Sequence, residues 1–248
     1  MSWRKPIEFG ISGGITTLSL AAVMSRLPRT GWLAWPCAVA ISLFVPETAL
    51  IDMQTWRGVP SHFNTDTGFD ATVFSVMGAL VAFVSLAIVV MTIWSFTSLR
   101  DPRSSALAVR TGMVLLTIGQ LLGFVLLGNG FAVDDVFRAS IVGAAGDLKL
   151  PHAVALHGLQ VLGLLALILE RSRLAESRRW QIVVVAIAGY ADALGVAAIQ
   201  AFGGRAPLDL TPLTLVGAFT AVVLLFLAYA SALRAAGPGV LRWSAPAN

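Results

Sequence analysis

Charge is scarce in this sequence. Only 12% of the 248 residues are Asp, Glu, Lys or Arg, whereas 57% are hydrophobic, and the mean hydropathy is +0.82. A soluble domain carries about 25% charged residues, so this chain has too few of them to cover a surface that faces water. The deficit excludes a soluble globular enzyme, a nucleic-acid-binding domain and a disordered protein. It indicates a polytopic protein embedded in a lipid bilayer.

Three residue types with specific chemistry are also rare. The single cysteine, Cys37, excludes an intrachain disulfide and a metal site built from several cysteines. The only lysines are Lys5 and Lys149, so the last hydrophobic segment has no amine for a Schiff base with retinal. There is no Walker motif and no GxGxxG string for a nucleotide. The sequence therefore offers no support for retinal, nucleotide or thiol chemistry.

Long apolar runs dominate what remains. Each is long enough to cross about 30 Å of hydrocarbon as a helix that rises 1.5 Å per residue. The sequence predicts one all-α membrane domain over residues 1–248, a bundle of seven transmembrane helices. Their predicted ranges are residues 8–25, 31–53, 70–99, 106–129, 152–170, 180–202 and 211–233.

The basic residues predict the orientation. With the N-terminus outside, eleven Lys and Arg fall on the cytoplasmic side and six on the outer side, and the rule that positive loops stay inside favours this arrangement. The cytoplasmic set is Arg26, Arg29, Arg100, Arg103, Arg110, Arg171, Arg173, Arg178, Arg179, Arg234 and Arg242, and the outer set is Arg4, Lys5, Arg57, Arg138, Lys149 and Arg205. We therefore expect an outer N-terminus and a cytoplasmic C-terminus.

Polar side chains inside the predicted helices fall at one depth. Counted along regular helices, they lie roughly 18–24 Å above the cytoplasmic helix ends. They are Glu47, Gln120, His157, Gln160 and Asp192. Amides at such positions often serve only as hydrogen bonds between helices. A carboxyl group costs several kcal/mol there, and an apolar surrounding favours its protonated form, which suits a proton donor.

The longer outer connections hold candidate binding residues. Trp56, Arg57, His62 and Asn64 lie in one of them, and Arg57 is expected to pair with Glu47 or Asp52. The segment could fold back over the polar layer. A divalent metal could be held by His62, His157 and one carboxylate, whereas only the residue types support a haem held by the two histidines.

Two strings carry a resemblance. Arg57-Gly58-x-x-Ser61-His62-Phe63-Asn64 and His152-x-x-x-x-His157-x-x-Gln160 resemble strings of uncharacterised bacterial multi-spanning membrane proteins. The resemblance implies an integral protein of the bacterial cytoplasmic membrane and transfers no activity. The length and helix number are also similar to those of small membrane-bound terpene cyclases, at the level of architecture alone.

The expected function is acid–base chemistry, metal-assisted or metal-free, on a lipid or isoprenoid. Glu47 and Asp192 would act as acid and base, and His157 with Gln160 would orient the substrate or a metal. The other expected substrate contacts are Gln120, Trp56, Arg57 and Asn64. One alternative is a non-catalytic subunit or assembly factor that binds a membrane-protein partner or a second copy. The other is a proton-linked transporter, for which interrupted helices are expected; prolines of this kind, Pro36 and Pro46, occur as a pair only in the second segment.

Overall fold

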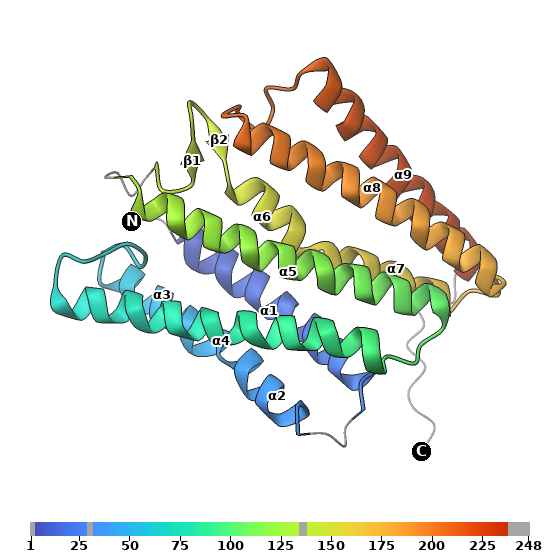
Figure 1. Ribbon diagram of the computed structural model, residues 1–248, viewed down its shortest axis with the longest axis horizontal. Coiled ribbons are helices and arrows are strands. Elements are labelled where there is room, and N and C mark those ends of the chain that lie inside the picture. The colour runs from blue at the N-terminus through green and yellow to red at the C-terminus, as the bar shows by residue number, and fades with distance from the viewer. Residues whose placement is uncertain (1–2, 29–31, 134–137, 238–248) are drawn as a thin grey trace. The chain divides into compact units, whose positions relative to one another are not determined.

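A computed structural model describes residues 3–28, 32–133 and 138–237. Arg29 and Arg242, which count toward the predicted orientation, lie outside the described residues. The described chain is helical apart from one short hairpin and the connections (Figure 1). The elements are α1 (Arg4–Ser25), α2 (Ala34–Ser42), α3 (Phe44–Trp56), α4 (Gly68–Ser98), α5 (Arg103–Phe131), β1 (Ile141–Val142), β2 (Gly146–Asp147), α6 (Lys149–Leu156), α7 (Gly158–Glu170), α8 (Glu176–Phe202) and α9 (Pro212–Ala236).

Seven spans in the described residues are long and apolar enough to cross a membrane. They are Arg4–Ser25, Ala34–Trp56, Gly68–Ser98, Arg103–Phe131, Lys149–Glu170, Glu176–Phe202 and Pro212–Ala236. The predicted all-α, multi-spanning membrane protein is thus confirmed, and every predicted segment matches one span. The second and fifth spans are interrupted, at Leu43 and His157. The orientation of the termini stays a prediction.

The contacts divide the chain into two compact units, and α5 contributes to both. The first unit contains the described residues of Met1–Leu99 and Gln120–Ser140. In it α1 packs on α2 and α3, which both pack on α4. Ile51, Val73 and Met77 form a small buried cluster between α3 and α4. Large apolar side chains such as Leu18 and Phe83 are exposed, as expected of a surface that faces lipid.

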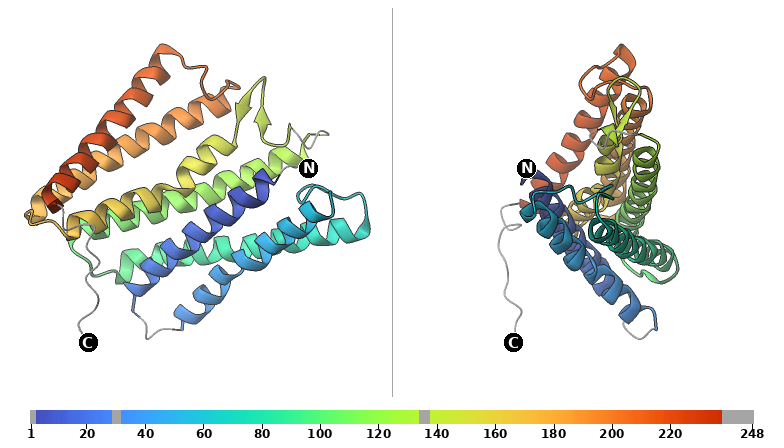
Figure 2. Two further views of the ribbon diagram at one scale, coloured as in Figure 1. Left: turned by 180° about the vertical axis from the view of Figure 1, so that it is seen from behind. Right: turned by 90° about the vertical axis from the view of Figure 1, so that its left-hand side faces the viewer.

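The second unit contains the described residues of Arg100–Gly119 and Ile141–Asn248. Its α8 and α9 lie side by side (Figure 2), and its core includes Leu162, Leu165 and Val183. Glycines let helices approach closely here. A Cβ atom on Gly112 would lie 2.7 Å from the Cα atom of Leu159.

The predicted orientation can be measured with reporters. We expect a fluorescent protein fused after the last residue to fluoresce in bacterial cells, and alkaline phosphatase at the same place to be inactive, because both outcomes require a cytoplasmic C-terminus. The same reporters inserted after Gly58, in the connection between α3 and α4, should give the reverse pattern. An active phosphatase at the C-terminus would contradict the orientation.

Candidate acid–base site

The interruption of the second span places Glu47. Pro46 has no N–H to donate to the carbonyl of Ser42, so the helix cannot continue regularly through this turn. The amide of Leu43 instead bonds to the carbonyl of Ala40 at 3.1 Å, and α3 begins at Phe44. Glu47 therefore lies in the first turn of a new helix, and its side chain is only 3% exposed.

Glu47 has an electrostatic partner in α1. The ammonium group of Lys5 lies close enough to interact electrostatically with the Glu47 carboxyl group. Among the described residues, no hydrogen bond or ion pair is formed by that carboxyl group. Its oxygens are therefore not engaged by another described side chain.

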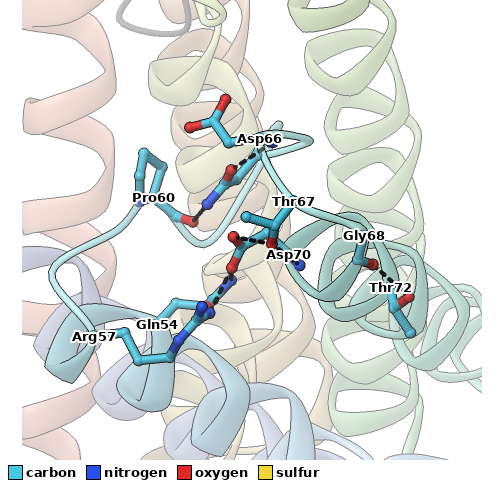
Figure 3. A network of polar contacts seen from close by, with 9 residues as sticks. Gln54, Arg57, Pro60, Asp66, Thr67, Gly68, Asp70 and Thr72 are labelled. Atoms are coloured by element: carbon cyan, nitrogen blue, oxygen red, sulfur yellow. Dashed lines mark hydrogen bonds and ion pairs between the residues drawn. The ribbon is translucent and has the colours of Figure 1, made fainter.

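The connection from α3 to α4 is fixed by a polar network around Asp70 (Figure 3). Asp70 is 2% exposed at the start of α4. Its carboxylate pairs with Arg57 and accepts hydrogen bonds from Gln54 at 3.0 Å and from the Thr67 hydroxyl at 2.6 Å. The Thr67 hydroxyl also accepts from the Asp70 backbone amide, which caps the helix.

The expected partner of Arg57 was wrong. Arg57 pairs with Asp70, and not with Glu47 or Asp52, because the connection returns the start of α4 to the end of α3. The Arg57 guanidinium also donates to the Gln54 side chain and lies 4.6 Å from the centre of the Phe69 ring. This side chain therefore holds the connection in place.

The middle of the same connection folds inward among aromatic rings. Phe63 adopts a φ of 57°, and its ring centre lies 5.3 Å from that of Phe74 and 5.4 Å from that of Phe131. A Cβ atom on Gly130 would lie 2.2 Å from the Phe63 ring, so only glycine leaves room for this ring. The positive φ is thus maintained by packing on α4 and on the end of α5.

His62 lies beside this aromatic cluster. Its ring centre is 5.7 Å from that of Phe9 in α1, and the Ser61 hydroxyl is 3.1 Å from its Nδ1 atom. Burial, together with the positive charge of Lys5, lowers the pKa of His62 from 6.5 to about 3. The imidazole is therefore neutral at pH 7, where it can donate or accept a hydrogen bond but is a weak proton acceptor.

Two further predicted contact residues have other surroundings. Asn64 is buried and organises the connection, since its amide donates to the Pro60 carbonyl at 3.0 Å and its oxygen accepts from the Asp66 amide. Trp56 is 77% exposed and contacts Trp3 edge to face. These positions suit loop structure and an interfacial aromatic residue, respectively.

The interruption of the fifth span was not expected. The sequence predicts one continuous helix over residues 152–170, but α6 begins at Lys149 and ends at Leu156. Carbonyls in the last turn of α6 find other donors: the Tyr190 hydroxyl donates to Val154 at 2.6 Å. The Gln160 amide, in the orientation that satisfies both of its ends, donates to Leu156 at 3.0 Å and to His157 at 3.2 Å.

The remaining predicted residues lie in the second unit or between helices of the first. His157 and Asp192 are partly buried, and Asp192 forms no hydrogen bond or ion pair with another described residue. Gln120 accepts a hydrogen bond from Ser85 at 2.8 Å, which joins α4 to α5. His152 bonds through Nδ1 to the carbonyl of Gly119 at 2.8 Å.

Lys5 thus interacts electrostatically with both Glu47 and His62, and we call these three residues the Lys5 group. Sequence analysis did not identify Lys5 as a site residue, because Lys5 appeared there only as a basic residue of the N-terminal tail. Asp192, His157 and Gln160 belong to the other unit, so a single site that includes them stays a prediction. In the part of the chain that the structure describes, no three His, Cys, Asp or Glu side chains group as metal ligands.

Comparison of the chain with models of known protein families, with curated proteins and with solved structures finds no match. The interpretation of the site therefore depends on its own geometry and chemistry.

The Asp70 network generates a stability prediction. We expect Asp70→Asn to lower the free energy of unfolding by about 1–3 kcal/mol, because Arg57 loses its counter-charge and a buried hydrogen-bond acceptor becomes a donor. Denaturation of the purified protein in detergent measures the change. Asp66→Asn is the matched control, since this carboxyl group is exposed and lies outside the network (Figure 3). Equal stabilities of the two variants would contradict the assigned role.

His62 generates a pH prediction. Its pKa is about 3 in the folded chain and 6.5 in the ordinary state, so the unfolded chain binds the extra proton first as the pH falls. The contribution of neutral His62 to the free energy of unfolding is complete above pH 6.5 and is lost progressively below it. Acidification from pH 7.5 to pH 5 should therefore cost about 2 kcal/mol of stability through this group. His62→Gln should lose less stability than the wild type over the same interval, and an unchanged loss would refute the assignment.

Proposed function

We propose that this protein is a membrane-embedded enzyme that performs acid–base chemistry on a lipid or isoprenoid substrate in a bacterial cytoplasmic membrane. The observation that carries the proposal is the Glu47 carboxyl group, which is 3% exposed, lies within a membrane span and has no hydrogen-bond partner among the described residues. Buried carboxyl groups in such surroundings are costly and are retained where they have a function.

The Lys5 group gives its members different roles. The Glu47 carboxyl group transfers the proton to the substrate and takes one back as the product forms. His62 orients the substrate by a hydrogen bond, because an imidazole with a pKa of about 3 does not hold a proton at pH 7. The Lys5 ammonium stabilises negative charge on Glu47 after the transfer. Asp192, His157 and Gln160 of the second unit are proposed as further acid–base and substrate-orienting residues.

The apolar surface indicates the substrate class. Exposed side chains on the spans are predominantly large and hydrophobic, so a molecule dissolved in the bilayer meets the protein directly. A polar metabolite would have to leave water first. A lipid or isoprenoid therefore fits the surroundings of Glu47 best.

A proton-linked carrier is the second candidate, and one observation favours it. Two spans are interrupted, and an ionisable residue lies at or close to each interruption: Glu47 near Leu43, and His157 at the break itself. Interrupted helices form the ion sites of many transporters.

The enzyme proposal is tested with the full chain in vesicles. The purified protein is reconstituted in a bacterial lipid extract supplemented with polyprenols, and mass spectrometry compares the lipids with those of protein-free vesicles. We expect a protein-dependent product, and we expect Glu47→Gln to slow its formation by about 100-fold or more, since removal of a general acid typically costs that much. Asp192→Asn and His157→Ala test the second unit.

Glu8→Gln is the matched control because Glu8 is an exposed carboxyl group of the first unit that pairs with Arg4. This variant should keep the wild-type rate. Full activity of Glu47→Gln would refute the proposed role. A pH-sensitive dye inside the same vesicles separates the two candidates: proton uptake that depends on Glu47, without any new lipid, would establish the carrier instead.

A further inference from the structure

Four arginines surround the short connection between α7 and α8. Arg171 and Arg173 lie in the connection, and Arg178 and Arg179 lie in the first turn of α8. We call these four residues the arginine cluster. The only acidic residue between positions 171 and 179 is Glu176, so the segment carries a strong positive charge.

The partners of the arginine cluster are uncharged. Arg171 donates to the Leu167 carbonyl at 3.1 Å, Arg178 to the Gln181 side chain at 3.1 Å, and Arg179 to the Ser172 carbonyl at 2.6 Å. No ion pair of these four side chains is formed within the described residues. The Nε atom of Arg179 is buried and has no hydrogen-bond partner there.

Glu176 forms no ion pair with the arginine cluster among the described residues, since its carboxylate serves another contact. It accepts a hydrogen bond of 2.6 Å from the backbone amide of Ser104 at the start of α5. This bond holds the start of α5, with Arg103 beside Ser104, against the start of α8. With four arginines and one glutamate, residues 171–179 keep an excess of positive charge.

Two further features favour an anion at this end of the unit. Ala175 forms no side-chain cap at the N-terminus of α8, so the helix dipole adds to the positive potential. Trp180 is 41% exposed directly after the cluster. Tryptophan at the end of a membrane span commonly lies at the level of the lipid headgroups.

We propose that the arginine cluster binds the phosphate groups of anionic phospholipids. Guanidinium groups form paired hydrogen bonds with phosphate oxygens, and basic clusters at the ends of membrane spans bind anionic lipids. Headgroups are the phosphates that a residue at the end of a span meets at high local concentration. The binding site is separate from the Lys5 group and does not depend on the proposed enzyme activity.

Lipid retention tests the proposal. The full chain is purified in detergent, mixed with equal amounts of phosphatidylglycerol and phosphatidylcholine, and analysed by native mass spectrometry. We expect preferential retention of phosphatidylglycerol. The variant Arg171→Gln/Arg173→Gln/Arg178→Gln should lower that preference by roughly tenfold or more. It keeps Arg179, whose bond to Ser172 holds the connection.

The matched control removes the same charge elsewhere. Arg4→Gln/Arg138→Gln/Arg205→Gln changes three arginines outside the cluster and should keep the wild-type preference. Should the first triple variant fail to fold, Arg173→Gln alone and a salt titration of the wild type provide the measurement, and the preference should fall in both. Equal retention of the two lipids by the wild type, or an unchanged preference in the cluster variants, would overturn the proposal. So would displacement of phosphatidylglycerol by an equal concentration of glycerol 3-phosphate, since that result would indicate a site for soluble phosphates.

Discussion

The apolar interior of a bilayer contains no water that could donate a hydrogen bond to a backbone carbonyl. Two spans of this protein are nevertheless interrupted, at Leu43 and at His157. Every carbonyl that an interruption frees needs a donor from the protein. At the second span the Leu43 amide and the Ser42 hydroxyl supply hydrogen bonds to the last turn of α2. At the fifth span Tyr190 and Gln160 do the same for α6. The positions of these side chains follow from the breaks they stabilise.

The same constraint explains why the connection from α3 to α4 is so tightly held. Asp70 is buried, and a buried carboxylate is tolerated only when several donors surround it. Arg57, Gln54 and Thr67 provide them from both sides of the connection. With its two ends closed together, the intervening segment has a fixed length to fill, and Phe63 packs its ring over Gly130. The position of His62 therefore follows from the Asp70 network and from the packing of Phe63.

Hydropathy alone predicted the spans, because the number of apolar residues per crossing is fixed by the bilayer thickness. The interruption near Glu47 also had a local signal, since Pro46 removes a specific hydrogen bond. The break at His157 had no local signal of this kind: Tyr190, which donates to the Val154 carbonyl, is 36 residues from Val154 in sequence. The partner of Arg57 could not be predicted for a related reason. Asp70 is 13 residues away, and their meeting depends on the path of a connection that includes a positive φ at Phe63.

Lys5 shows how a charge can have a role that composition conceals. In the sequence, Lys5 enters only the count of basic residues that predicts the orientation of the chain in the membrane. In the structure its ammonium interacts with both Glu47 and His62, and it lies 5.8 Å from the centre of the Phe9 ring, which also contacts His62. With a neutral imidazole and an ionised Glu47, the three side chains have no net charge. Protonation of Glu47 would leave one positive charge on the group, because Lys5 keeps its ammonium charge while His62 stays neutral.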